Sequence, residues 1–149
     1  MARFKFRLAT LRRLREQHRD ELRGRLAEAY EAERLLAEQR RGVHDETATL
    51  RDVQRQMVSA ASPNVNQLLE AQRYGALLQS RDAALGKQMQ QVAEEIERRR
   101  LAVVEADRQV KALDKLEDRQ RAEFDAVQLQ IQQKEMDEIA GQRRGAVEA

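Results

Sequence analysis

The 149-residue chain has no cysteine, no tryptophan, a single proline and only 3% aromatic residues. Without cysteine it can form neither a disulfide framework nor a cysteine-ligated metal site. The shortage of aromatic side chains argues against the three-dimensional core of an ordinary globular domain. No apolar run approaches the roughly 18 to 20 residues of a membrane-spanning helix, so no transmembrane segment is expected. No apolar stretch typical of a secretory signal peptide occurs near the N-terminus.

The chain carries instead a seven-residue repeat of apolar side chains. In the row that starts at Leu8, seven of eight positions are apolar, although 36% of all residues are charged. The row consists of Leu8, Arg15, Leu22, Ala29, Leu36, Val43, Leu50 and Met57. A strict period of seven keeps one row on one stripe of an α-helix, which a supercoiled partner helix must cover. A second row, offset by four residues, starts at Phe4 and is half polar.

One break interrupts this pattern, at Ser62-Pro63-Asn64. Proline lacks an N–H and clashes with the preceding turn, so Pro63 cannot lie inside a helix. Ser62 as the N-cap with Pro63 at the first helical position predicts the start of a second helix, and Asn64 or Asn66 could cap it instead. The expected elements, in one rod covering 1–149, are a helix over about 4–59, a turn over about 60–65, a helix over about 66–140 and a frayed tail over 141–149.

Two long amphipathic helices joined by a short turn predict an all-α fold, a long antiparallel two-helix coiled-coil hairpin whose second helix is the longer. A turn centred near Pro63 places Phe4 opposite about residue 122, so the second helix projects past the N-terminus. Phe124, Val127 and Ile131 would then lack intramolecular cover, which marks a docking surface. A wider turn would shift this register by several residues and shorten the projection.

Charge is unevenly distributed along the chain. The formal net charge is +2, yet residues 1–25 contain nine Lys or Arg and three acids. A basic end on an otherwise near-neutral rod indicates an acidic partner surface, with a solvated helix face as the alternative.

No catalytic or cofactor-binding constellation is present, so no enzyme activity and no cofactor are expected. The six glycines are scattered and form no phosphate-binding loop. His18 and His44 are too far apart along one helix to share a metal, and no metal site is expected. The Arg98-Arg99-Arg100 run lacks aromatic neighbours and is flanked by acids, so nucleic-acid binding is not expected.

Three short motifs occur near both ends and late in the second helix: Phe4-Lys5-Phe6-Arg7-Leu8 with Leu11 and Arg12-Arg13-Leu14, then Lys111-Ala112-Leu113-Asp114-Lys115-Leu116, and finally Asp137-Glu138-Ile139-Ala140 with Arg143 and Arg144. These motifs resemble those of the flagellar FliJ family. The order of these motifs and their distances from the termini match the family, as do the chain length and Tyr74 after the turn. The resemblance covers essentially the whole chain.

The resemblance implies a cytoplasmic component of the bacterial flagellar type III export apparatus, peripheral to the inner membrane at the flagellar base. Such proteins are antiparallel two-helix coiled coils similar to the central stalk of rotary ATPases. The end bearing both termini sits in the pore of the hexameric export ATPase. The stalk also links that ATPase to the membrane export gate and interacts with export chaperones, and the free protein is expected to be a monomer.

On this interpretation the ATPase-facing end is formed by eight side chains: Phe4, Phe6, Leu8, Arg12, Arg13, Phe124, Val127 and Ile131. Three other functions are compatible with the same pattern. One is the corresponding stalk of an injectisome, which differs in partners rather than in physics. The others are a chaperone that clamps an unfolded client with its exposed seam, and a homodimeric structural rod in which two chains cover each other.

Overall fold

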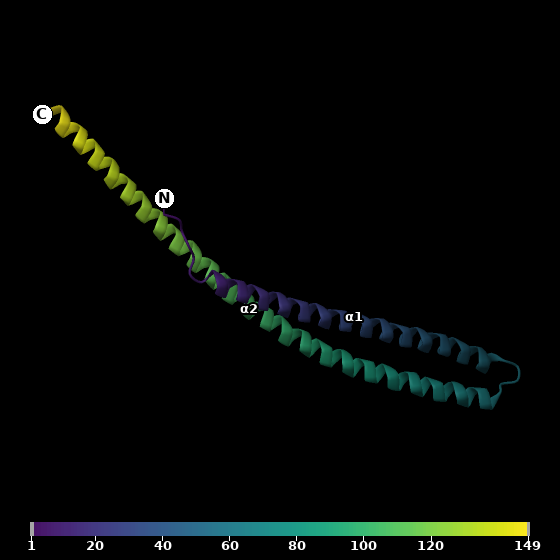
Figure 1. Cartoon of the computed structure of the whole chain (residues 1–149). Coiled ribbons are helices and arrows are strands. Elements are labelled where there is room, and N and C mark those ends of the chain that lie inside the picture. The colour runs from purple at the N-terminus through teal and green to yellow at the C-terminus, as the bar shows by residue number, and fades with distance from the viewer. Residues whose placement is uncertain (1, 149) are drawn as a thin grey trace. The chain divides into compact units, whose positions relative to one another are not determined.

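The computed structural model describes residues 2–148, which form two α-helices and no strand. Helix α1 spans Ala9–Ser59 (51 residues) and helix α2 spans Val65–Glu148 (84 residues), as Figure 1 shows. The prediction of an all-α hairpin with a longer second helix is therefore confirmed.

Helix α1 begins at Ala9, whereas the heptad pattern predicts a start near Phe4. The preceding residues are non-helical, and Phe6 is only 8% exposed. On a helix, side chains two residues apart point about 200° apart, so Phe4 and Phe6 could not share a face. An extended backbone places them on the same side. The burial of Phe6 therefore accounts for the late start of the helix.

The loop between the helices covers residues 60–64 and ends in a side-chain cap. The Asn64 Oδ1 atom accepts a hydrogen bond from the Asn66 backbone N–H at 3.0 Å, and the Asn64 carbonyl accepts one from the Leu68 N–H at 3.1 Å. Asn64 is thus the N-cap of α2, in place of Ser62. Pro63 lies before the cap, where its missing N–H breaks no helical hydrogen bond.

At its other end α2 continues through Gly141 and Gly145 to Glu148, where the sequence predicts a frayed tail. Among the described residues no glycine has a positive φ, so neither residue adopts the left-handed conformation that usually ends a helix at glycine. Each glycine weakens the helix by about 1 kcal/mol relative to alanine, which does not by itself end it. Ala149 lies outside the described residues.

The chain divides into two units. Unit 1 consists of the described parts of Met1–Asp20 and Val104–Ala149, and unit 2 is Glu21–Val103. In unit 2, contacts join Arg25 to Arg99, Arg40 to Asp82 and Glu46 to Tyr74. In these successive contacts the residue numbers rise along α1 while they fall along α2, so the two helices pair in an antiparallel way. The seam of unit 2 is formed by its buried residues, Ala29, Ala71, Leu78 and Ile96.

Unit 1 has its own antiparallel pairing. Arg15 contacts Gln109, Arg12 contacts Asp114, and Phe4 contacts Phe124. Phe4 therefore lies opposite residue 124, close to the expected position near 122. The buried residues of this unit are Phe6, Ala106 and Val110.

Candidate functional site

The N-terminal segment, residues 2–8, is anchored in unit 1 by its aromatic rings. The Phe4 ring lies 5.7 Å from the Phe124 ring on α2, with the ring planes tilted by 56°. Phe6 is buried, whereas Arg3, Lys5 and Arg7 are exposed. This alternation of covered and exposed side chains is typical of an extended backbone. The segment thus places its rings inward and its positive charges in solvent.

Two guanidinium groups cover the rings. Arg121 Cζ lies 5.4 Å from the centre of the Phe4 ring, and Arg12 Cζ lies 5.7 Å from the centre of the Phe6 ring. Cations over aromatic faces at these distances are attracted by the ring quadrupole. Each ring of the segment therefore has its own arginine.

The Glu117 carboxylate on α2 joins these two arginines. It forms an ion pair with Arg12, and its Oε1 atom lies 3.2 Å from Arg121 Nη2. Only 14% of the Glu117 side chain is exposed. Arg12 also lies 3.8 Å from Asp114 and 3.9 Å from Glu16. Arg12 is thus surrounded by carboxylates of its own unit, and its charge is largely compensated.

The other cations near the N-terminus differ in their surroundings. Arg15 donates a hydrogen bond to the Gln109 side chain at 3.0 Å. Arg13 is exposed, and within residues 2–148 it forms no ion pair with a carboxylate, nor do Arg3, Lys5 and Arg7. Arg3, Lys5, Arg7 and Arg13 therefore contribute uncompensated positive charge to the surface of this end.

Beyond Phe124, the α2 helix of unit 1 loses its cover. Val127 is 51% exposed and Ile131 is 42% exposed, and every residue from Leu129 to Glu148 is exposed. Further large apolar side chains follow in this part of α2, namely Leu129, Met136, Ile139 and Val147. In Figure 1 this part of α2 extends past the N-terminus as a lone helix. Val127 and Ile131 lie on the same side of this helix, whereas Leu129 and Met136 lie on the opposite side. Large apolar side chains that no other element covers are typical of an interaction surface.

The structure thus divides the eight side chains expected at this end. Phe4, Phe6, Arg12 and Phe124 belong to one cluster. In it, the Phe4 ring contacts the Phe124 ring, and Arg12 covers the Phe6 ring and pairs with Glu117. The other four remain available to a partner because they are exposed: Leu8, Arg13, Val127 and Ile131.

Sequence reasoning missed Arg121 and the role of Glu117. Glu117 stands at an apolar position of its heptad row, where it reads as a side chain that reaches out to solvent. The four-residue spacing of Glu117 and Arg121 was the available signal, since such pairs meet on a helix. The two-residue spacing of Phe4 and Phe6 was the corresponding signal for a non-helical segment.

The described residues hold no group of three or more His, Asp or Glu side chains that could bind a metal ion. Within residues 2–148 neither helix has a stretch apolar enough to cross a membrane.

Comparison with known proteins identifies the family. A family model described as "Flagellar FliJ protein" matches residues 4–146, nearly the whole chain. Comparisons with curated proteins and with solved structures found no match. This family consists of export-apparatus components rather than enzymes. The chain therefore belongs to the flagellar FliJ protein family and is a component of the flagellar export apparatus.

Proposed function

We propose that this protein is a non-enzymatic coupling stalk that docks by unit 1 in the ring of the hexameric flagellar export ATPase. The observation that carries the proposal is the uncovered part of α2 in unit 1, where every residue from Leu129 to Glu148 is exposed. Leu129, Met136 and Ile139 are exposed, and their burial by a partner would lower the free energy because apolar surface would leave water.

The N-terminal segment and Arg13 of α1 supply the polar part of the proposed contact. Arg3, Lys5, Arg7 and Arg13 are exposed and have no carboxylate partner among the described residues. They fit an acidic lining of the ring pore, because uncompensated surface charge steers and orients association. Phe4, Phe6, Arg12 and Phe124 shape this end, whereas Leu8, Val127 and Ile131 add apolar contact.

The proposal extends to the other partners implied by family membership. We infer that the stalk links the ATPase to the membrane export gate and contacts export chaperones, in the cytoplasm at the flagellar base. The match to a flagellar family favours the flagellar apparatus over an injectisome.

The test is ATP turnover by the purified export ATPase with and without this protein. We expect the wild-type chain to raise turnover, and we expect reversal of the exposed cations (Arg7→Glu with Arg13→Glu) to weaken this effect. The loss should be largest at low salt, because ionic strength screens exposed charges. The matched control reverses two exposed arginines of unit 2, Arg41→Glu with Arg73→Glu, and should leave the stimulation intact.

Arg12 is unsuitable for this test because its charge holds Glu117 and covers the Phe6 ring. A loss of stimulation in Arg12→Glu would mix docking with local unfolding. If both double variants behave alike, the charge of the N-terminal end has no part in docking. If the wild-type chain leaves turnover unchanged, the coupling stalk itself is wrong.

A homodimeric rod is the second candidate, because a second copy could also cover the exposed face of α2 beyond Phe124. Light scattering separates the two. A monomer that stimulates the ATPase supports the stalk, and a stable dimer without effect supports the structural rod.

A further inference from the structure

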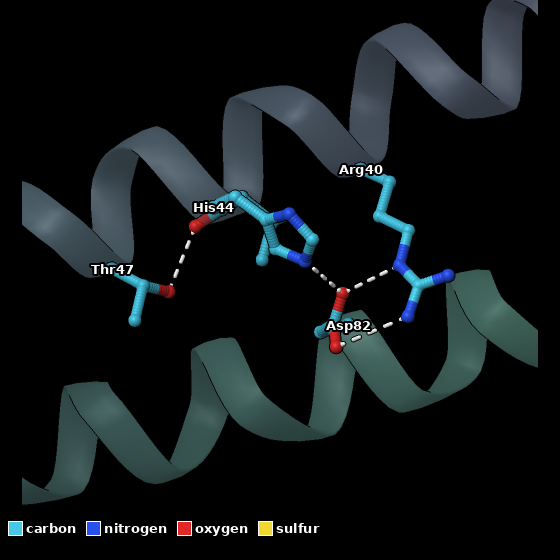
Figure 2. Close-up of polar contacts among 5 residues, drawn as sticks. Arg40, His44, Thr47 and Asp82 are labelled. Carbon is cyan, nitrogen blue, oxygen red and sulfur yellow. Dashed lines mark hydrogen bonds and ion pairs between the residues drawn. The ribbon is translucent and has the colours of Figure 1, made fainter.

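In unit 2, one carboxylate of α2 is held by two side chains of α1. The Asp82 Oδ1 atom accepts hydrogen bonds from Arg40 Nε at 2.8 Å and from His44 Nε2 at 2.7 Å. Arg40 Nη2 adds a longer contact to Asp82 Oδ2 at 3.5 Å. Figure 2 shows the two donors reaching the same carboxylate from different sides.

The spacing of the two donors along α1 restricts the axial position of the Asp82 carboxylate. Arg40 and His44 are four residues apart, so they are about 6 Å apart along α1. A shift of α2 toward either donor moves Asp82 away from the other one. A carboxylate between two donors on one helix therefore resists displacement along the axis in both directions.

The Asp82 carboxylate remains charged in this position. The hydrogen bond from Arg40 is the main cause that lowers the pKa of Asp82, and the hydrogen bond from His44 acts in the same direction. The same contact raises the pKa of Arg40. His44 and Asp82 line a groove whose lining also includes the charged side chain of Arg51.

Apolar packing alone does not define the axial position of the helices here. A groove of about 440 Å³ lies next to Asp82, and its lining includes Leu50, Gly75 and Leu78. Apolar seams tolerate alternative alignments better than polar contacts do, and a polar residue in the seam is a well-attested way to select one register.

The loop does not impose the axial position either. Residues 60–64 are non-helical, and five residues can span roughly 17 Å when extended. The distance between packed helix axes is about 8–10 Å. The loop therefore has enough length to follow a slide of one helical turn.

We propose that Arg40, His44 and Asp82 form an axial lock, which holds α1 and α2 of unit 2 in one register and prevents their sliding. The lock acts within the chain, so it does not depend on the identity of the docking partner. It would let the paired helices of unit 2 carry an axial force together.

The residues around the lock discriminate against slid alignments. A slide of one turn in one direction places Asp82 beside Leu36 and Arg40, so the contact with His44 is lost. The opposite slide places it beside His44 and Ala48, so the contact with the Arg40 cation is lost. Either slide therefore breaks one of the two contacts that the native alignment makes.

Cysteine pairs report the register directly, because the chain has no cysteine of its own. The pair Leu50→Cys with Gly75→Cys reports the native alignment, since a Cβ on Gly75 would lie 3.4 Å from Leu50 Cδ2. Two pairs report a slide of one turn, Leu50→Cys with Ala71→Cys and Leu50→Cys with Gln79→Cys. Each pair is placed in the full chain, and disulfide formation under mild oxidation is quantified by mass spectrometry.

With the lock intact, the native pair should form far more readily than the slid pairs. In Asp82→Asn, and independently in Arg40→Gln with His44→Gln, we expect the ratio of slid to native disulfide to rise several-fold. Far-UV circular dichroism identifies any variant that loses helix. The second variant keeps the test decisive if the first one unfolds.

Two matched controls remove charges that form ion pairs within one helix only. Glu97 pairs with Arg100 on α2, and Arg34 pairs with Glu31 and Glu38 on α1. Glu97→Gln and Arg34→Gln should leave the disulfide ratio at its wild-type value. If the lock variants give the same ratio as these controls, the contact has no role in register and the proposal is wrong.

Discussion

At the scale of single residues, Glu117 shows how one side chain organises the N-terminal end. Its carboxylate lies between Arg12 of α1 and Arg121 of α2, and each guanidinium covers one phenylalanine ring. Without that negative charge, Arg121 would lose the carboxylate that it pairs with, and Arg12 would keep only its longer contacts with Asp114 and Glu16. The position of the aromatic segment thus depends on a charge that contacts neither ring.

Glu117→Gln should lower the free energy of unfolding by about 1 kcal/mol, as expected for a partly exposed ion pair with two cations. It should also increase hydrogen exchange in the N-terminal segment. Chemical unfolding and exchange mass spectrometry measure both effects. The control is Glu123→Gln, an exposed carboxylate in the same part of α2. Equal effects of the two variants would contradict the role assigned to Glu117.

Several carboxylates make stability depend on acid pH. The pKa values of Glu31, Glu95 and Glu97 are lowered, mainly by hydrogen bonds from neighbouring arginines. The native state therefore binds fewer protons than the unfolded state near pH 4. The stabilisation is complete above the unfolded pKa values and is lost as the pH falls through the lowered native values.

Thermal unfolding between pH 6 and pH 2 tests this dependence. The wild-type melting temperature should fall as the pH drops below about 4.5, close to the unfolded pKa of glutamate. A variant in which Glu31, Glu95 and Glu97 are all replaced by Gln should show a shallower fall. An unchanged slope would mean that these ion pairs do not stabilise the native state.

At the scale of helices, the periodicity of apolar side chains predicts where the long helices run but not the residues at which they begin and end. The apolar rows and Pro63 were sufficient to predict two helices and the loop between them. The start of α1 at Ala9 was not predicted, because Phe4 continues the heptad pattern. Only the burial of Phe6 accounts for a non-helical segment before Ala9. The end of α2 was misjudged because glycine permits a helix end but does not require one.

Gly24, inside α1, offers a test of intrinsic helix stability. No atom lies within 4 Å of a Cβ added there, so Gly24→Ala introduces no clash. It should raise the free energy of unfolding by about 0.5–1 kcal/mol, because alanine loses less backbone entropy than glycine. The matched control, Ala27→Gly at an exposed position nearby, should lower it by a similar amount. No difference between the two variants in urea unfolding would show that this part of α1 does not limit stability.

At the scale of the whole molecule, the candidate site was predictable in composition but not in organisation. The uncovered α2 residues Val127 and Ile131 followed from the unequal helix lengths, which a sequence reveals. The different surroundings of Arg12 and Arg13 could not be predicted from the sequence. Adjacent arginines look alike until the position of Glu117 is known, because it pairs with Arg12. Distances between side chains on different helices depend on register, and a heptad pattern leaves several registers open.

Removal of residues 129–148 separates folding from docking. Every residue of this segment is exposed, so its loss uncovers no buried surface. The shortened chain should therefore keep the melting temperature of the full chain while it loses the stimulation of ATP turnover.

A shortened control that keeps α2 intact but lacks residues 2–8 should instead lose the cover over Phe124 and show weaker protection there by hydrogen exchange. If the chain without residues 129–148 still stimulates the ATPase fully, the docking surface lies elsewhere. If its melting temperature drops and its mass by light scattering halves, the segment served a dimer, because association stabilises the folded chain and would bury a face that is exposed in the single chain.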